Sequence, residues 1–240
     1  MYGGYGMGYG YGFDPTILLV LIGVALSLWA QGRVNSAFSR YSKVRSRTGM
    51  TGAEAARRLL NSQGIYDVTV RAVAGSLTDH YDPRTKTVNL SEAVYGASSV
   101  AAIGVAAHEC GHAMQHNEEY GPLRFRSALV PVANLGSRIS WPLILVGIIF
   151  GGLGSPLVQI GILMFTLAVL FQLVTLPVEF NASNRAVKLL DSQGILASDE
   201  VSGTRKVLSA AALTYVAAAA TSILQLLRLV ILFGGRNRRD

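Results

Sequence analysis

The chain has 240 residues, of which 50% are hydrophobic and 15% are charged, and its mean hydropathy is +0.38. This composition is too apolar for an ordinary soluble domain and predicts that the lipid bilayer is the solvent of part of the chain. The net charge of +7 would suit nucleic acid, but the basic residues flank the apolar stretches, so we expect lipid headgroups and no nucleic acid as their partners. The single cysteine, Cys110, excludes an intrachain disulfide and is most simply explained as a buried helix residue.

The first two segments are a polar tail and an apolar helix. Residues 1–13 are rich in Gly and Tyr and contain no Lys or Arg, which predicts a disordered tail rather than a signal peptide. No charged residue lies between Asp14 and Arg33, so a first transmembrane helix is predicted over 14–32. Basic residues follow this helix and none precede it, which places the N-terminus outside and residue 33 onward in the cytosol.

Residues 33–137 read as a small folded α+β domain. The helices and strands expected in it are 53–62, 66–73, 77–82, 87–90 and 99–116. Thr51 is expected to cap the first helix and Gly64 to end it. The two strands 77–82 and 87–90 predict a hairpin, and turn chemistry before Pro83 explains Asp79, His80 and Asp82 better than a second metal site does.

The second half of the chain alternates membrane and soluble segments. No charged residue lies between Arg138 and Glu179, and glycines interrupt this stretch near its middle, so 138–178 predicts a hairpin of two spans. Residues 179–206 are expected to be a cytosolic helix that Glu179 opens. Residues 207–240 form an Ala-rich helix and a basic tail. A fourth span is slightly favoured there; the alternative is a helix that packs on the cytosolic domain, which would keep the final arginines inside.

One short motif points to a metal. His108, Glu109 and His112 form the sequence His-Glu-x-x-His, and two histidines four residues apart on a helix project from one face. Both imidazoles can therefore bind one Zn²⁺, while Glu109 is placed to take a proton from water. The apolar residues 100–107 before the motif predict that the helix is buried on one side and held rigid.

Catalytic zinc needs a third protein ligand. The acidic and histidine candidates are His116, Glu118, Glu119, Asp191 and Glu179. His116 lies one turn farther along the same helix, too far along the axis to join the site comfortably. Glu118 could reach the metal only if the chain turned sharply after His112, typically at a glycine, and Gln115 occupies that position. Glu179 is favoured because the hairpin returns it to the side of the histidines; the alternative is a solvated acid at a helix N-terminus.

The motif region 107–116, the two-span hairpin and the segment 176–183 (Leu-Pro-Val-Glu-Phe-Asn-Ala-Ser) together resemble the YugP-type neutral membrane zinc metallopeptidases of bacteria. More distantly they resemble membrane gluzincins such as the CAAX prenyl protease. The resemblance implies a mostly α-helical membrane protein with a small α+β, zincin-like cytosolic domain. It also implies Zn²⁺ on His108, His112 and Glu179, with Glu109 catalytic. Ser183 stands where the distant relatives have an aspartate near the ligand, so the residues that orient the ligands are expected to differ.

These observations predict a multi-pass plasma-membrane endopeptidase with a cytosolic active site, acting on peptides or membrane proteins. Tyr215, Arg185 and Asn181 are the candidates for stabilising an oxyanion, and residues 85–90 are suggested as a strand edge for the substrate. Two alternatives stay open. An intramembrane-cleaving protease would need the motif inside a span, and a non-catalytic scaffold or regulator would use zinc for structure alone.

Overall fold

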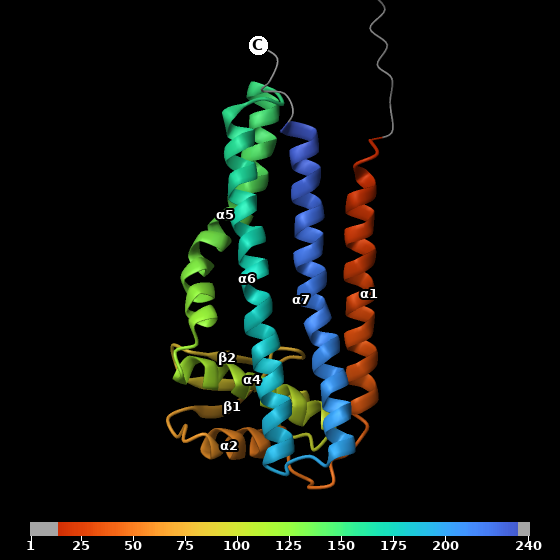
Figure 1. Ribbon diagram of the computed structural model, residues 1–240, viewed down its shortest axis with the longest axis vertical. Helices are drawn as coiled ribbons and strands as arrows, with labels where there is room; N and C mark the ends of the chain where they lie inside the picture. The colour runs from red at the N-terminus through yellow and green to blue at the C-terminus, as the bar shows by residue number, and fades with distance from the viewer. Residues whose placement is uncertain (1–13, 235–240) are drawn as a thin grey trace, which may run out of the picture.

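The computed structural model describes residues 14–234, so the predicted Gly/Tyr tail and the last arginines lie outside the described residues. The elements in chain order are α1 (Ile17–Tyr41), α2 (Gly52–Ser62), β1 (Thr69–Val73), β2 (His80–Asp82), β3 (Thr87–Ser91), α3 (Glu92–Tyr95), α4 (Val100–Asn117), α5 (Gly121–Gly151), α6 (Pro156–Ser192) and α7 (Ser198–Phe233). The long helices α1, α5, α6 and α7 run along the longest axis, and the short elements gather at one end (Figure 1). We call this the sheet end, and the opposite end of the long helices the far end.

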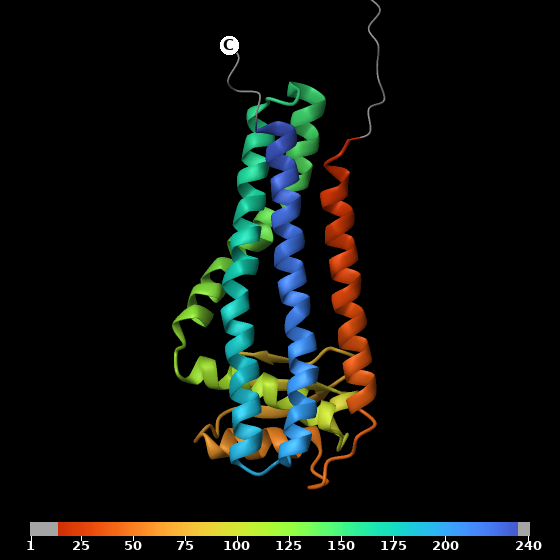
Figure 2. The same ribbon diagram turned by 45° about the vertical axis from the view of Figure 1, so that its right-hand side comes forward.

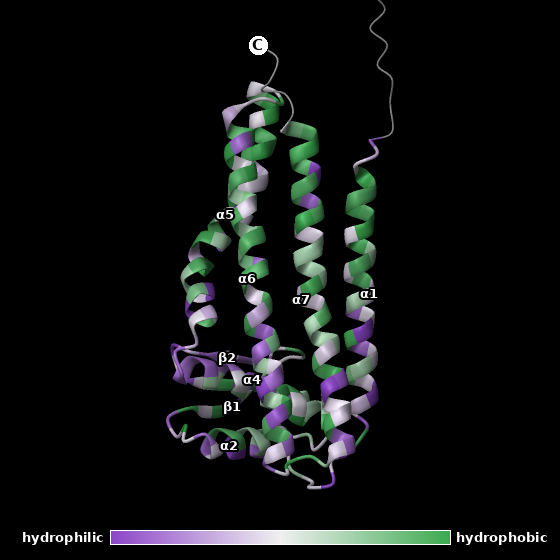
Figure 3. Cartoon of the chain, in the orientation of Figure 1, coloured by the Kyte–Doolittle hydropathy of each residue, from purple (hydrophilic) through white to green (hydrophobic). Residues whose placement is uncertain are grey.

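The long helices have the properties of membrane spans. Within residues 14–234, the four of them are long and apolar enough to cross a bilayer. Large apolar side chains such as Leu28, Leu163 and Ile231 are exposed on them, which suits lipid. Hydrophobic residues cover the far part of these helices, and hydrophilic residues gather toward the sheet end (Figure 3). Apolar helices lie where the first span and the two-span hairpin were predicted, and α7 is likewise a candidate span by length and composition.

The helices are longer than the sequence indicated. Helix α1 continues to Tyr41, α5 begins at Gly121, and α6 is unbroken from Pro156 to Ser192. Glu179 therefore lies inside a helix, and the prediction that it opens one is wrong. Pro177 precedes it within α6, and a proline is tolerated inside a membrane helix because neighbouring groups satisfy the backbone that it frees.

The sheet has three strands in the order β1-β3-β2. Strands β2 and β3 form the predicted antiparallel hairpin, and β1 pairs with β3 in parallel. Because β3 is hydrogen-bonded on both sides, the suggestion that 85–90 is a free edge is wrong; β1 and β2 are the edges. Strand β1 begins at Thr69, three residues later than the alternating pattern indicated.

The helix ends follow the predicted chemistry. The Thr51 hydroxyl accepts a hydrogen bond from the Glu54 amide, and the Glu54 carboxylate accepts one from the Thr51 amide. This reciprocal capping fixes the start of α2. Gly64 and Gly194 end α2 and α6 with φ angles of +71° and +60°, values that favour glycine.

Helix α4 lies at the centre of the sheet end, against α2, α6 and α7, as both ribbon views show (Figure 2). Its apolar first half is buried, as predicted. Gly111 lets α6 come close: a Cβ there would lie 2.6 Å from the Ala182 carbonyl oxygen. Gly104 similarly faces Thr204 of α7. The glycines of α4 thus bring two long helices against the motif.

Polar contacts join α1 and the two residues Asp14 and Thr16 before it to α7, away from the sheet. At the far end, the Arg228 guanidinium donates to Asp14 at 3.1 Å and to Thr16 at 3.2 Å. Farther along the pair, the Thr221 hydroxyl donates to the Gly23 carbonyl at 3.1 Å. The charge of Arg228 is therefore paired, which offsets the cost of carrying an arginine on a candidate membrane span.

Candidate metal centre

Helix α4 sets the relation between the two motif histidines. The helix starts at Ser99, whose hydroxyl accepts a hydrogen bond from the Ala102 amide. The rings of His108 and His112 lie on one face, with centroids 4.8 Å apart and planes nearly perpendicular. Both Nε2 atoms point toward the same carboxylate of α6, which completes the cluster.

Glu179 supplies that carboxylate. Its Oε2 lies 3.3 Å from Nε2 of His108 and 3.5 Å from Nε2 of His112, and the three ligand atoms lie within 4.8 Å of one another. Oε2 is buried and has no partner with hydrogen-bonding geometry among the described residues. Donor atoms about 2.0–2.1 Å from a tetrahedral zinc lie roughly 3.4 Å apart. The spacing, the unsatisfied oxygen and the donor types therefore fit Zn²⁺.

Neutral side chains orient both imidazoles. The Ser183 hydroxyl is 3.1 Å from Nδ1 of His108, and Oε1 of Gln115 is 3.0 Å from Nδ1 of His112. A partner on Nδ1 leaves Nε2 free to bind a metal. Ser183, at the position of the expected aspartate, therefore still contacts a ligand, although without a charge.

Gln115 also joins the two helices that carry the ligands. Its side chain is fully buried, and its Nε2 donates to the Val178 carbonyl at 2.8 Å and to Asn181 at 2.9 Å. Val178 directly precedes Glu179, so one amide holds His112 and the backbone beside Glu179 at once. Sequence reasoning missed this role; the only signal was a polar residue one turn beyond His112 on the buried face.

A cleft opens above the motif helix. Its volume is about 700 Å³, and the residues that line it include His108, Glu109, His112, Glu179 and Tyr215. Strand β2 and the first turns of α5 form its walls. Helix α5 contains Pro131 and Pro142, and its first turns lean away from α6 before the two helices run together (Figures 1 and 2). A smaller, mostly apolar cavity of about 160 Å³ lies on the other side of the same groups, toward α1.

Glu109 and Tyr215 border both cavities. Glu109 is only 8% exposed, follows His108 in sequence and lines the cleft beside the cluster. Tyr215 comes from α7 and faces Glu179. Of the oxyanion candidates, it is the one that lines the cleft.

The other two oxyanion candidates have partners away from the cleft. Arg185 donates two hydrogen bonds to Glu118, at 2.6 and 2.7 Å, and a third to Asn181. The guanidinium lowers the pKa of Glu118, which is consistent with a charged pair. Asn181 in turn accepts from Gln115. These residues support the ligands from behind.

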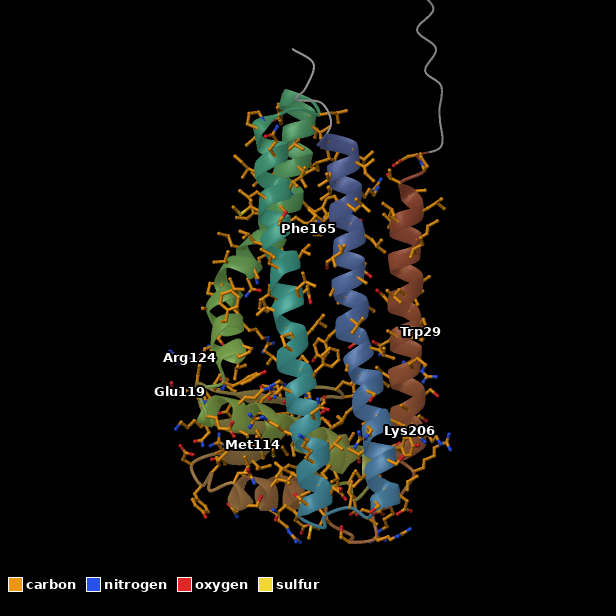
Figure 4. The ribbon with its side chains drawn as sticks, viewed as in Figure 1. Trp29, Met114, Glu119, Arg124, Phe165 and Lys206 are labelled. Atoms are coloured by element: carbon orange, nitrogen blue, oxygen red, sulfur yellow. The ribbon has the colours of Figure 1, made fainter. Side chains whose placement is uncertain are left out.

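The remaining candidates for a third ligand lie elsewhere. Nδ1 of His116 is 2.8 Å from the Tyr81 hydroxyl, at the rim of the cleft. Burial, followed by the charges of nearby aspartates, raises the pKa of Tyr81 to about 12, so the phenol stays protonated. Glu119 pairs with Arg124 at 3.0 Å, and both point outward where α4 meets α5 (Figure 4). Asp191 is exposed near the end of α6.

Two further expectations concern residues away from the metal. Cys110 is buried against α2, where its thiol contacts the Ala56 carbonyl, and burial raises its pKa; this confirms a packing role. Asp79 accepts hydrogen bonds from the backbone and hydroxyl of Ser91, and Asp82 accepts one from the Arg84 amide. Loop and turn bonding therefore accounts for both aspartates, as predicted.

Arg126 was not singled out from the sequence. It lies on the first turns of α5 and lines the cleft, with Nη2 4.0 Å from Oε1 of Glu179. No sequence pattern pointed to it, because 52 residues, including most of the two-span hairpin, lie between it and Glu179.

The geometry agrees with comparisons to known proteins. The model of the family described as "Putative neutral zinc metallopeptidase" matches residues 16–234. The chain belongs to this family. It is 52% identical over 224 residues to the "Putative membrane protease YugP" of Bacillus subtilis (strain 168), covering 93% of this chain and 98% of the relative. No solved structure matches the chain. The family match confirms the resemblance that the motif and the hairpin indicated.

Proposed function

We propose that the protein is a membrane-anchored zinc endopeptidase that hydrolyses peptide bonds at the cytosolic face of the plasma membrane. The observation that carries this proposal is the buried, unsatisfied Oε2 of Glu179 at metal-ligand spacing from the two imidazoles. Glu109 stands beside this cluster and opens into the cleft. The family membership and the membrane-protease relative support the same chemistry.

Each residue of the cluster has a distinct role in this proposal. His108, His112 and Glu179 would hold Zn²⁺, which supplies a Lewis acid that polarises water and the scissile carbonyl. Glu109 accepts a proton from the attacking water and passes it to the leaving amine. The Tyr215 hydroxyl donates a hydrogen bond to the oxygen of the substrate carbonyl.

Strand β2 is the proposed binding edge for the substrate. It is an outer strand of the sheet, and His80 and Tyr81 line the cleft. An extended peptide could add to this edge through backbone hydrogen bonds and cross the metal cluster. This replaces β3, which has no free edge.

The distribution of charge supports a cytosolic sheet end. The basic residues around it come from three helices and a loop: Arg33, Arg40, Lys43, Arg45, Arg47, Lys188, Arg205 and Lys206, the last labelled in Figure 4. At the far end of the described residues, Arg228 is paired with Asp14. By the positive-inside rule, this asymmetry within the described residues supports a cytosolic sheet end.

The two alternatives fit the geometry less well. Helix α4 is not among the four candidate spans, whereas an intramembrane-cleaving protease would carry its motif within one. A structural zinc site usually has four protein ligands, and within residues 14–234 the cluster has three. A cleft beside a three-ligand cluster favours catalysis.

The test compares the purified wild type with Glu109→Gln. Both proteins should bind zinc equally, because Glu109 is not a ligand, and only the wild type should cleave a casein-like or membrane-protein substrate. Zinc is measured by atomic absorption, and cleavage by the appearance of new peptide termini. Equal cleavage by both proteins would refute the proposal.

A further inference from the structure

Arg126 has a guanidinium with unused donors beside the metal cluster. Its Nη2 lies 4.0 Å from Oε1 of Glu179, beyond hydrogen-bonding distance. Its Nε is buried and has no hydrogen-bond partner among the described residues. The guanidinium carbon lies 5.9 Å from the centroid of the Phe171 ring, which holds the group from one side. Arg126 thus lies beside the cluster but makes no hydrogen bond to Glu179.

The neighbouring arginines do not share this condition. Arg124, two residues earlier on α5, is 70% exposed and pairs with Glu119. Arg185 makes a two-bond pair with Glu118 and does not line the cleft. Of the Arg126 guanidinium only Nε is buried, whereas the side chain as a whole is 30% exposed and lines the cleft. Its donors are therefore open to an anion that arrives in the cleft.

The reaction proposed above generates such an anion. When water attacks the scissile carbonyl carbon, one water proton passes to Glu109 and the C=O π electrons move onto the carbonyl oxygen. Negative charge therefore leaves Glu109 and appears on the substrate oxygen. The oxyanion electron pair then re-forms the C=O bond and the C–N bond breaks, its electron pair leaving with the nitrogen, to which Glu109 returns the proton. Glu179 faces the imidazoles with Oε2 and Arg126 with Oε1, so the guanidinium lies beside the cluster at which this charge would develop.

We propose that Arg126 is a catalytic residue that binds the oxyanion of the tetrahedral intermediate, together with Tyr215. This assignment rests on the proposed peptidase function. It gives α5 a part in the site, because its leaning first turns bring Arg126 to the cluster. Arginine suits this role, since its fork of donors can bond two oxygens of a tetrahedral centre at once.

The test uses the full chain, loaded with zinc, in detergent micelles. Two inhibitors with the same side chains are compared: a phosphinic peptide, whose tetrahedral oxygens imitate the intermediate, and a mercaptoacyl peptide, which meets the metal through one sulfur. Arg126→Met should weaken binding of the phosphinic peptide by about 10²–10³-fold, the usual effect of removing one oxyanion donor. Binding of the mercaptoacyl peptide should fall far less. Arg126→Lys should fall between, because lysine keeps the charge and loses the fork.

The matched control is Arg138→Met, which removes an exposed positive charge from the same helix about 18 Å farther along. It should bind both inhibitors as the wild type does, and all variants should keep their zinc. Loss of zinc, or equal weakening of both inhibitors, in Arg126→Met would show that Arg126 only positions Glu179 and would overturn the proposal.

Two further outcomes separate the possible failures. Peptides with a free and an amidated C-terminus are cleaved in parallel; a defect of Arg126→Met confined to the free acid would assign Arg126 to the substrate C-terminus instead and overturn the proposal. If the wild type holds zinc but neither binds the inhibitors nor cleaves a peptide, the peptidase function itself fails. If the wild type binds both inhibitors and Arg126→Met binds each of them as tightly as the wild type does, only the proposed role of Arg126 is wrong.

Discussion

The two ends of the long helices are held together in different ways. At the far end α6 packs against α5 through small residues: a Cβ on Gly161 would lie 2.9 Å from the Ser140 carbonyl, while large side chains such as Leu163 face outward. At the sheet end the same helix buries Leu190 in the core and Glu179 in the metal cluster. In lipid, burying apolar surface between helices gains little, so close backbone contact matters more. In water, apolar burial stabilises a core that can hold charged groups in fixed positions.

This comparison predicts that a small change at the sheet end will have a large effect. Gly111→Val would place side-chain atoms against the Ala182 backbone, where even a Cβ would lie 2.6 Å from the carbonyl oxygen. We expect α4 and α6 to separate, at a cost of about 3 kcal/mol, and zinc binding to be lost. Zinc content and the thermal midpoint in detergent measure the two effects.

The control for that substitution is Gly32→Val on α1, where nothing lies within 4 Å of an added Cβ. It should retain zinc and unfold close to the wild-type temperature. Normal zinc content in Gly111→Val would show that the two helices tolerate separation, and the close contact would then not be what positions Glu179.

A smaller effect is expected at Gln115. Replacing it with Leu keeps a similar volume but removes the bonds to His112, Val178 and Asn181. Zinc affinity should fall about 10–100-fold, as is usual when the group that orients a ligand is lost. Competition with a chromophoric chelator measures it, and Gln63→Leu at the exposed end of α2 serves as the control. An unchanged affinity would mean that His112 is oriented by packing alone.

The smallest effect is expected at the far end. Arg228→Met leaves Asp14 without its ion-pair partner, which should destabilise the α1–α7 contact only slightly, because a partly exposed ion pair contributes little. The double variant with Asp14→Asn should recover part of this loss, because no unpaired charge remains. Unfolding in a denaturing detergent series measures it. Zinc content should stay at the wild-type level, and a loss of zinc would contradict the separation between the two ends.

Local signals predicted much of this molecule. The His-Glu-x-x-His helix, the capping of α2 by Thr51 and the apolar helices follow from residues close together in sequence. Glu179 could be expected in the cluster because a hairpin of two spans must return to its starting side. In these cases each residue's role depends on spacing or on topology, and both can be read along the chain.

The parts that could not be predicted depend on contacts between distant residues. The end of the uncharged stretch suggested a helix start at Glu179, but α6 continues through Pro177 to Ser192. Strand β3 looked like an edge until β1 was found beside it. The role of Gln115 depends on the rotamer of its side chain, and that of Arg126 depends on how the first turns of α5 lean. The periodicity of apolar residues in the sequence reveals neither.

Helix α6 carries a candidate membrane span and the Glu179 carboxylate without a break. In a bilayer, the height of that carboxylate above the lipid is therefore fixed by the number of helical residues between it and the apolar stretch, at about 1.5 Å for each. A thicker or thinner membrane that tilts α6 would shift Glu179 relative to α4. The geometry of the cluster, and under the proposed function the depth at which a substrate is cut, then depend on the surrounding lipid as well as on the protein.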